Sequence, residues 1–110
     1  MAKEANPGVR LPNLIGKPKR FAAGAALFRQ GDKAAAFFRI DRGEVRVGKL
    51  DDDGRFLEVA RLGPGEFIGE AVAFLGVRFP FHAEAASDTE ATVFRADEVI
   101  AALGRDPASA

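Results

Sequence analysis

The sequence predicts an all-β barrel or sandwich. Three observations support this. From Lys19 onward, short apolar segments alternate with glycine-centred breaks. The glycines of four breaks, Gly31, Gly43, Gly54 and Gly65, are eleven or twelve residues apart, a spacing typical of short strands joined by turns. With 110 residues, 47% hydrophobic and 29% charged, the composition is that of one globular domain with a modest core.

Several segments have the composition of strands by themselves. Residues 37–40 and 92–94 are rich in aromatic and β-branched side chains. Residues 44–47 alternate between charged and apolar side chains, so Val45 and Val47 are expected to face the core. Residues 83–85 are expected to form a further strand.

A hairpin is predicted around the polar run at residues 51–54. Gly54 can adopt the positive φ that a tight turn needs, and the run joins the strand at 44–47 to one at 56–60. The three alanines at 34–36 favour a helix by intrinsic propensity. We expect tertiary packing to override that preference, because Phe and Ile side chains follow at strand spacing.

Two short helices are predicted, at residues 69–76 and 96–104. Each ends at a glycine, and the second carries acidic residues in its first turn. Asp106 and Pro107 form a good N-cap and first-turn pair, so they predict the start of another helix. We therefore expect the chain to be a fragment of a longer protein.

The expected organisation has three parts. Residues 1–18 hold three prolines and two glycines and are expected to be an irregular or flexible lead-in. Residues 19–95 should form the β domain. Residues 96–110 should hold the C-terminal helix and the beginning of the next one.

Composition excludes several classes of function. Without cysteine there is no thiolate metal site, iron–sulfur cluster or cysteine nucleophile, and one histidine cannot build a multi-histidine metal centre. Sixteen basic and sixteen acidic residues argue against nucleic-acid binding by this domain itself. Neither a membrane-length apolar run nor a signal region is visible, so we expect no membrane contact and a cytoplasmic location. No catalytic constellation includes Ser87 or Ser109, so no enzyme is expected.

The chain contains, in order, LFRQGD at residues 27–32, FFRI at 37–40, GEVRV at 43–47 and LGPGEFIGE at 62–70. This series resembles the cyclic nucleotide-binding domain, and more narrowly the sensory domain of Crp/Fnr-type transcriptional regulators. The likeness runs from about Phe21 to Leu103. It implies a mainly β fold, an eight-stranded β-roll of jelly-roll kind with short flanking helices.

The resemblance also implies a binding site at Gly69, Glu70 and Ala71. In the family this segment holds a phosphate, since glycine permits close backbone approach and backbone N–H groups suit an anion. The glutamate accepts a hydrogen bond from the ribose 2′-hydroxyl, and a following arginine pairs with the phosphate. The implied ligand is a small anionic effector, most simply cAMP or cGMP.

The sequence departs from the family pattern at the arginine. Its usual position falls on Phe79, the next position on Pro80, and Arg78 lies one place away. On a strand, a shift of one residue turns a side chain to the opposite face, unless a bulge at Pro80 restores it. Arg78 therefore joins Gly69, Glu70 and Ala71 as a candidate ligand-binding residue. The stretch at residues 78–85 is closer to the oxygen- and redox-responsive branches, whose cluster cysteines are absent here.

Three functions remain open. The first is a sensor in which effector binding repositions the helices after Phe94; the resemblance then implies a homodimer, with DNA contacted only through a domain absent from this chain. The second is a degenerate β-roll that binds no nucleotide and serves protein–protein interaction. The third, a cupin-like metal enzyme, is disfavoured because a histidine cluster is missing.

Other residues have two interpretations each. His82 suits a haem ligand or a pH switch, but a half-buried strand position is the commoner role of such a residue. The aromatic and proline side chains at residues 79–81 suit an apolar effector pocket or simple packing under a loop. The acidic residues at 51–53 are expected to be a solvated turn and not a calcium loop. The basic run at residues 17–20 is too short for a nucleic-acid site.

Overall fold

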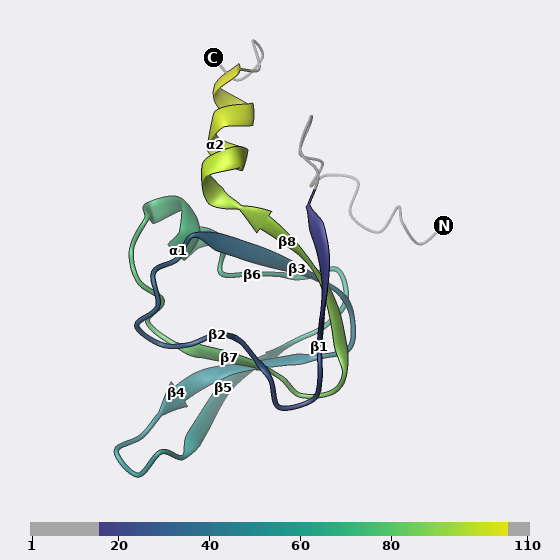
Figure 1. Ribbon diagram of the computed structural model, residues 1–110. Helices are drawn as coiled ribbons and strands as arrows, with labels where there is room; N and C mark the ends of the chain where they lie inside the picture. Colours follow the sequence, from purple (N-terminus) through teal and green to yellow (C-terminus); the bar gives the residue numbers. More distant parts are fainter. Residues whose placement is uncertain (1–15, 106–110) are drawn as a thin grey trace.

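The computed structural model describes residues 16–105 and, for side chains, residues 16–102. This part of the chain forms eight strands and two helices (Figure 1). In order they are β1 (Lys17–Phe21), β2 (Ala26–Phe28), β3 (Ala36–Arg42), β4 (Val45–Leu50), β5 (Phe56–Leu62), β6 (Phe67–Ile68), α1 (Glu70–Leu75), β7 (His82–Ala85), β8 (Thr89–Arg95) and α2 (Ala96–Arg105).

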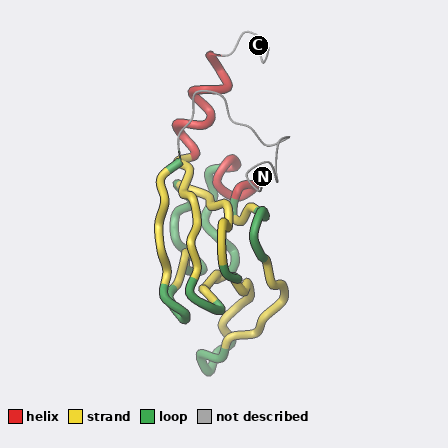
Figure 2. The backbone as a smooth tube through the Cα atoms, turned by 90° about the vertical axis from the view of Figure 1, so that its right-hand side faces the viewer, coloured by secondary structure: helices red, strands yellow, loops and turns green. Residues whose placement is uncertain are grey.

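The strands make two antiparallel sheets of four strands each. One sheet has the order β1-β8-β3-β6 and the other the order β2-β7-β4-β5. Both helices lie at one end of the strands (Figure 2). This arrangement confirms the mainly β fold, the eight strands and the short flanking helices that the resemblance implies.

The core lies between the two sheets. Ile40 and Val45 have no exposed surface and Val47 is 7% exposed, which confirms the inward orientation expected for both valines. Aromatic rings supply much of the remaining volume, and Phe21 and Phe28 both pack on Phe38 at ring-centre distances of 6.0 and 6.2 Å. Rings of this size bury large apolar areas, which is what a chain of this length needs for a stable core.

The predicted hairpin is β4–β5. Gly54 has a φ of 83° and donates its N–H to the Asp51 carbonyl oxygen at 2.9 Å. The Asp51 side chain accepts N–H bonds from Asp53 and Arg55 at 2.9 and 2.8 Å. The acidic run is therefore a turn held by its own first residue, as expected for an aspartate in this position.

The alanines at 34–36 are not helical, as predicted. Ala36 begins β3, whereas Ala34 is buried and donates its N–H to the Val77 carbonyl oxygen at 3.2 Å. Packing against a distant loop thus overrides a local helical preference.

Element boundaries differ from the expected ones. β1 already begins at Lys17, which pairs with Val93 of β8, so the expected end of the irregular lead-in at residue 18 lies inside a strand. α1 is shorter than predicted because Gly69 and Gly76 are its caps, both left-handed, and α2 extends one residue further to Arg105. Residues 1–15 and 106–110, with the expected helix start at Asp106 and Pro107, lie outside the described residues.

Neither of the described helices has the length and apolar character needed to cross a membrane.

Gly43 is expected to be the least replaceable turn glycine. Its φ is 92°, and a Cβ there would collide with the Asp88 carbonyl oxygen and lie 2.8 Å from the Thr89 Cα atom. We expect Gly43→Ala to lower the free energy of unfolding by about 2 to 4 kcal/mol, the combined cost of the left-handed conformation and overpacking.

Gly54→Ala provides the matched control in urea denaturation. Gly54 has a similar φ of 83° but nothing within 4 Å of its added Cβ. Gly54→Ala should lower the free energy of unfolding by only about 1 kcal/mol, the cost of the left-handed conformation alone. Equal losses in the two variants would contradict the collision at Gly43.

Candidate functional site

The segment from Gly69 to Ala71 begins where the short strand β6 passes into α1. Gly69 adopts a φ of 86° at the N-cap of the helix, with no side-chain cap. A Cβ at this position would lie 3.1 Å from the Phe79 ring and 3.4 Å from the Phe28 ring. Glycine is therefore required here both by the backbone conformation and by the two rings beside it.

Phe79 occupies the position that the resemblance assigns to arginine. Its side chain is only 4% exposed and belongs to the core. The ring stacks on Phe28 with centres 3.7 Å apart and an angle of 9° between the ring planes, and Phe81 lies 5.8 Å from Phe28. Where a phosphate would need a cation, this chain has an aromatic stack against Gly69.

Arg78 is held by the turn at Gly31. Its guanidinium Nη1 donates to the Gly31 carbonyl oxygen at 2.9 Å, and its backbone forms an antiparallel bridge with Lys33. The register shift of β7 occurs opposite residues 26–28 of β2 and not at Pro80, which precedes β7. The structure thus brings Gly69, Glu70 and Ala71 together but directs Arg78 to the Gly31 turn.

Glu70 is the one charged residue among the three candidates at residues 69–71, and its charge is unpaired within residues 16–102. It is half-buried at the first position of α1, whereas Ala71 is exposed. Among the described residues, no Lys, Arg or His side-chain nitrogen comes within 4.0 Å of its carboxylate, and it accepts no hydrogen bond. An anionic ligand at this place would therefore meet a carboxylate with no cation bound to it.

His82 is buried on the outer face of the second sheet and is 5% exposed. Its Nε2 lies 3.4 Å from a Glu84 oxygen, and the Phe56 ring stands edge-on to the imidazole at 5.6 Å. Its buried Nδ1 has no partner among the described residues. Those residues contain no group of three or more potential metal ligands. His82 is a strand residue and is more buried than the half-buried position that the sequence suggested.

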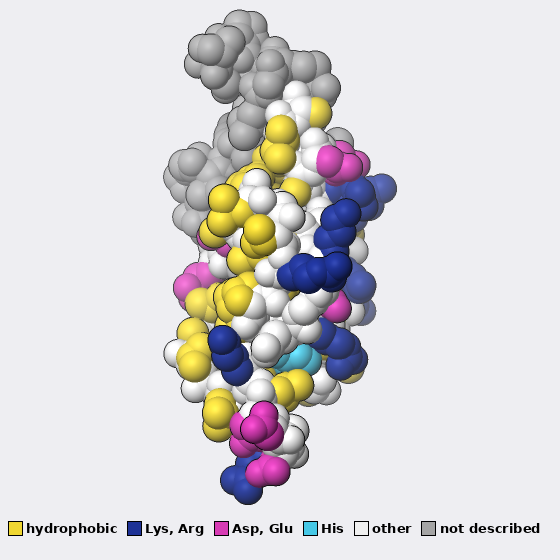
Figure 3. All heavy atoms as spheres, turned by 90° about the vertical axis from the view of Figure 1, so that its left-hand side faces the viewer, with side chains coloured by type: hydrophobic (Ala, Val, Ile, Leu, Met, Phe, Trp, Pro, Cys, Tyr) yellow, Lys and Arg dark blue, Asp and Glu magenta, His cyan; other side chains and the backbone are white. Residues whose placement is uncertain are grey.

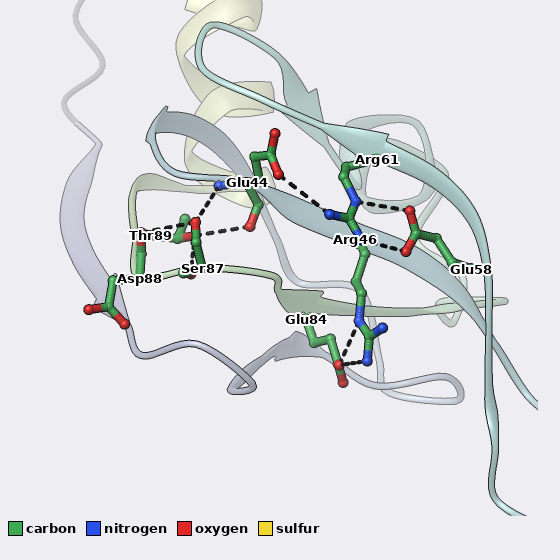
Figure 4. A network of polar contacts seen from close by, with 8 residues as sticks. All are labelled: Glu44, Arg46, Glu58, Arg61, Glu84, Ser87, Asp88 and Thr89. Atoms are coloured by element: carbon green, nitrogen blue, oxygen red, sulfur yellow. Dashed lines mark hydrogen bonds and ion pairs between the residues drawn. The ribbon is translucent and has the colours of Figure 1, made fainter.

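Charged side chains link β4, β5 and β7 on this outer face (Figure 4). Arg46 donates Nε to Glu84 at 2.8 Å and lies 4.4 Å over the Phe56 ring centre. Arg61 lies between Glu58 and Glu44, at 2.7 and 3.5 Å. The hydrogen bond from Arg61 lowers the pKa of the Glu58 carboxyl. These pairs compensate one another's charge across the strands.

A second aromatic cluster links β3, β6, β8 and α1 at the helical end of the domain. This cluster was not predicted from the sequence. Phe37 of β3 lies 5.2 Å from Phe74 of α1 and 5.3 Å from Phe94 of β8, ring centre to ring centre. Phe67 lies about equally close to Phe37 and Phe94, at 6.1 Å from each. The Ala96 N–H, at the start of α2, donates to the Ala35 carbonyl oxygen at 3.0 Å. Phe37 therefore packs on α1 and on the strand that leads directly into α2.

The fold agrees with the comparison with known sequences. The profile of the cyclic nucleotide-binding domain matches residues 18–106. The chain belongs to the cyclic nucleotide-binding domain family. The transcriptional regulator LdrP of Thermus thermophilus is 37% identical to this cyclic nucleotide-binding domain over 75 residues, which are 68% of this chain and 37% of LdrP.

Solved structures show the same fold. The catabolite activator protein of Thermus thermophilus is 28% identical, with a TM-score of 0.73 over 82% of this chain and 42% of that protein. The N-terminal domain of a transcriptional regulator from Streptomyces coelicolor has a TM-score of 0.77 at 23% identity, over 86% of this chain and 67% of that one. The match to LdrP spans only 37% of the length of that regulator.

Proposed function

We propose that this chain is the regulatory β-roll of a Crp/Fnr-type transcriptional regulator, and that it works without a cyclic nucleotide at residues 69–71. The observation that carries the second part is the stack of Phe79 on Phe28 against Gly69. A phosphate in that place would lose water and gain no charged partner, and transfer of an unpaired charge out of water is strongly unfavourable.

The first part is supported by the family match and by relatives that are themselves transcriptional regulators. In the whole protein we propose a homodimer in the cytoplasm, with DNA contacted through a domain outside these residues. The equal numbers of basic and acidic residues support this division, because a DNA-contacting domain usually has a basic surplus.

The route of the signal follows from the aromatic cluster. Phe74 places α1 against Phe37, and Phe37 stacks on Phe94 two residues before α2. We propose that a change in the position of α1 alters the packing of Phe94 and so the direction of α2. Packed cores transmit such shifts because close-packed rings cannot be displaced one at a time.

A second candidate function is a cyclic nucleotide sensor that depends on Glu70. The unpaired, half-buried carboxylate favours it, since such a group offers an acceptor to a ribose hydroxyl. In this candidate the affinity would come from Glu70 and backbone N–H groups without an arginine.

Calorimetric titration with cAMP and with cGMP separates the two candidates. We expect no binding by the full chain, with Kd above about 1 mM, and the same result for Glu70→Ala. Micromolar binding that is lost in Glu70→Ala would overturn the nucleotide-free proposal and support the sensor. Glu66→Ala is the control, because Glu66 lies on the preceding turn, where its side chain accepts the Gly63 N–H.

A further inference from the structure

Two loops next to the Phe28–Phe79 stack form one rigid platform. They connect β2 to β3 and α1 to β7, and they run side by side (Figure 1). Backbone hydrogen bonds join them at three points: Gly31 N–H to the Phe79 oxygen at 2.8 Å, Phe79 N–H to the Asp32 oxygen at 2.9 Å, and Ala34 N–H to the Val77 oxygen at 3.2 Å. The last two bonds flank Lys33 and Arg78 and make these residues partners in an antiparallel bridge. The side chains on these loops therefore have a fixed base.

This platform carries three exposed cations, Arg29, Lys33 and Arg78. Lys33 and Arg78 are direct partners in the bridge. Side chains directly opposite each other on such a pair have Cβ atoms about 5 Å apart, and like charges there destabilise the pair. Figure 3 views the side of the molecule on which these loops lie, and Lys and Arg side chains gather along one edge of that face, with acidic side chains between them.

The charge of the platform is not compensated. Asp32 is the one acidic residue in the two loops, at residues 29–35 and 76–81, and its carboxylate accepts the Arg29 backbone N–H at 3.1 Å. Within the described part of the chain, no carboxylate comes within 4.0 Å of the side-chain nitrogens of Arg29, Lys33 or Arg78.

Several other exposed arginines of the described residues are paired, whereas Arg55 is not. Arg20 and Arg42 both lie near Glu90, at 3.8 and 3.9 Å, and Arg61 pairs with Glu58 at 2.7 Å. The bridge thus holds Lys33 and Arg78 beside each other as a like-charge pair, with no carboxylate of the described residues within 4.0 Å of either side-chain charge.

We propose that Arg29, Lys33 and Arg78 form a docking surface for an acidic segment of a protein partner. Arg78 uses Nη1 for the Gly31 carbonyl, which leaves its Nε and Nη2 donors for a carboxylate in the paired geometry that arginine favours. The cations lie on exposed loops, which suits a partner chain better than an enclosed small molecule. The zero net charge of the chain disfavours nucleic acid as the partner.

The test is fluorescence anisotropy with a labelled peptide of ten glutamates at low salt. The full chain should bind it, and the triple variant Arg29→Ala, Lys33→Ala, Arg78→Ala should bind at least about tenfold more weakly. The control is the triple variant Arg20→Ala, Arg42→Ala, Arg61→Ala, which removes the same charge from paired arginines and should keep the full affinity.

The proposal would be overturned by no binding to the peptide, by equal losses in both triple variants, or by tighter binding of a 20-base-pair DNA duplex than of the peptide. Thermal unfolding checks both variants, and the platform variant should unfold within a few degrees of the parent, because it loses the exposed Arg78–Gly31 hydrogen bond as well as a like-charge pair. The single variant Lys33→Glu reverses one exposed charge and should weaken peptide binding more than Lys33→Ala. None of the three cations belongs to residues 69–71, and the peptide test uses no nucleotide, so its outcome is independent of the nucleotide titration.

Discussion

Phe79→Ala is expected to lower the free energy of unfolding by about 3 to 5 kcal/mol, the usual cost of removing a buried phenylalanine ring. Phe79 is 4% exposed, and its backbone N–H and carbonyl both bond to the loop between β2 and β3. Because those backbone bonds remain in the alanine variant, the measured loss reports the ring. Urea denaturation followed by circular dichroism provides the value.

Phe81→Ala is the comparison for this variant. Phe81 is half-buried and lies 5.8 Å from Phe28, so its replacement should cost about half as much. A loss below about 1 kcal/mol for Phe79→Ala would contradict the tight stack. A loosely packed Phe79 ring would not exclude a ligand from the space beside Gly69. That result would therefore also weaken the proposal that this chain binds no nucleotide.

Phe37→Ala is expected to have a similar effect, about 3 to 5 kcal/mol, and to disturb the helical end of the domain. Phe37 is 2% exposed and contacts Phe67, Phe74 and Phe94. Its removal separates α1 from β8, so we expect a loss of helical signal at 222 nm before the global transition, in addition to the lower stability.

Phe74→Ala tests whether the ring on α1 contributes as much to the free energy of unfolding as the Phe37 ring does. Phe74 is 43% exposed, so its removal should cost less than half of the Phe37 value. If Phe74→Ala and Phe37→Ala cost the same, Phe37 is not the centre of the cluster and the proposed route from α1 to α2 fails.

The sequence predicted elements where local chemistry is decisive. The turn at residues 51–54 formed as expected because Asp51 caps its own turn and Gly54 accepts a φ of 83°. α1 lies between two capping glycines, Gly69 and Gly76, which both have left-handed conformations and are visible in the sequence. The inward orientation of Val45 and Val47 followed from strict alternation, because neighbouring side chains on a strand point to opposite faces.

Other elements have no local signal. β2 and β6 have three and two residues, too few for a period to be visible. They exist because β7 and β3 supply pairing partners. The Lys33–Arg78 bridge likewise joins residues that are far apart in the chain, and no propensity argument brings two such loops together.

The candidate site divides in the same way. The sequence by itself determined the family motif at Gly69, Glu70 and Ala71 and the replacement of the expected arginine by Phe79, because residue identity is a property of the chain. Only the tertiary structure decided where the two displaced side chains lie. Phe79 fills the space beside Gly69 because Phe28 offers it a ring to stack on, and Arg78 faces the Gly31 turn because adjacent residues of an extended backbone point to opposite sides.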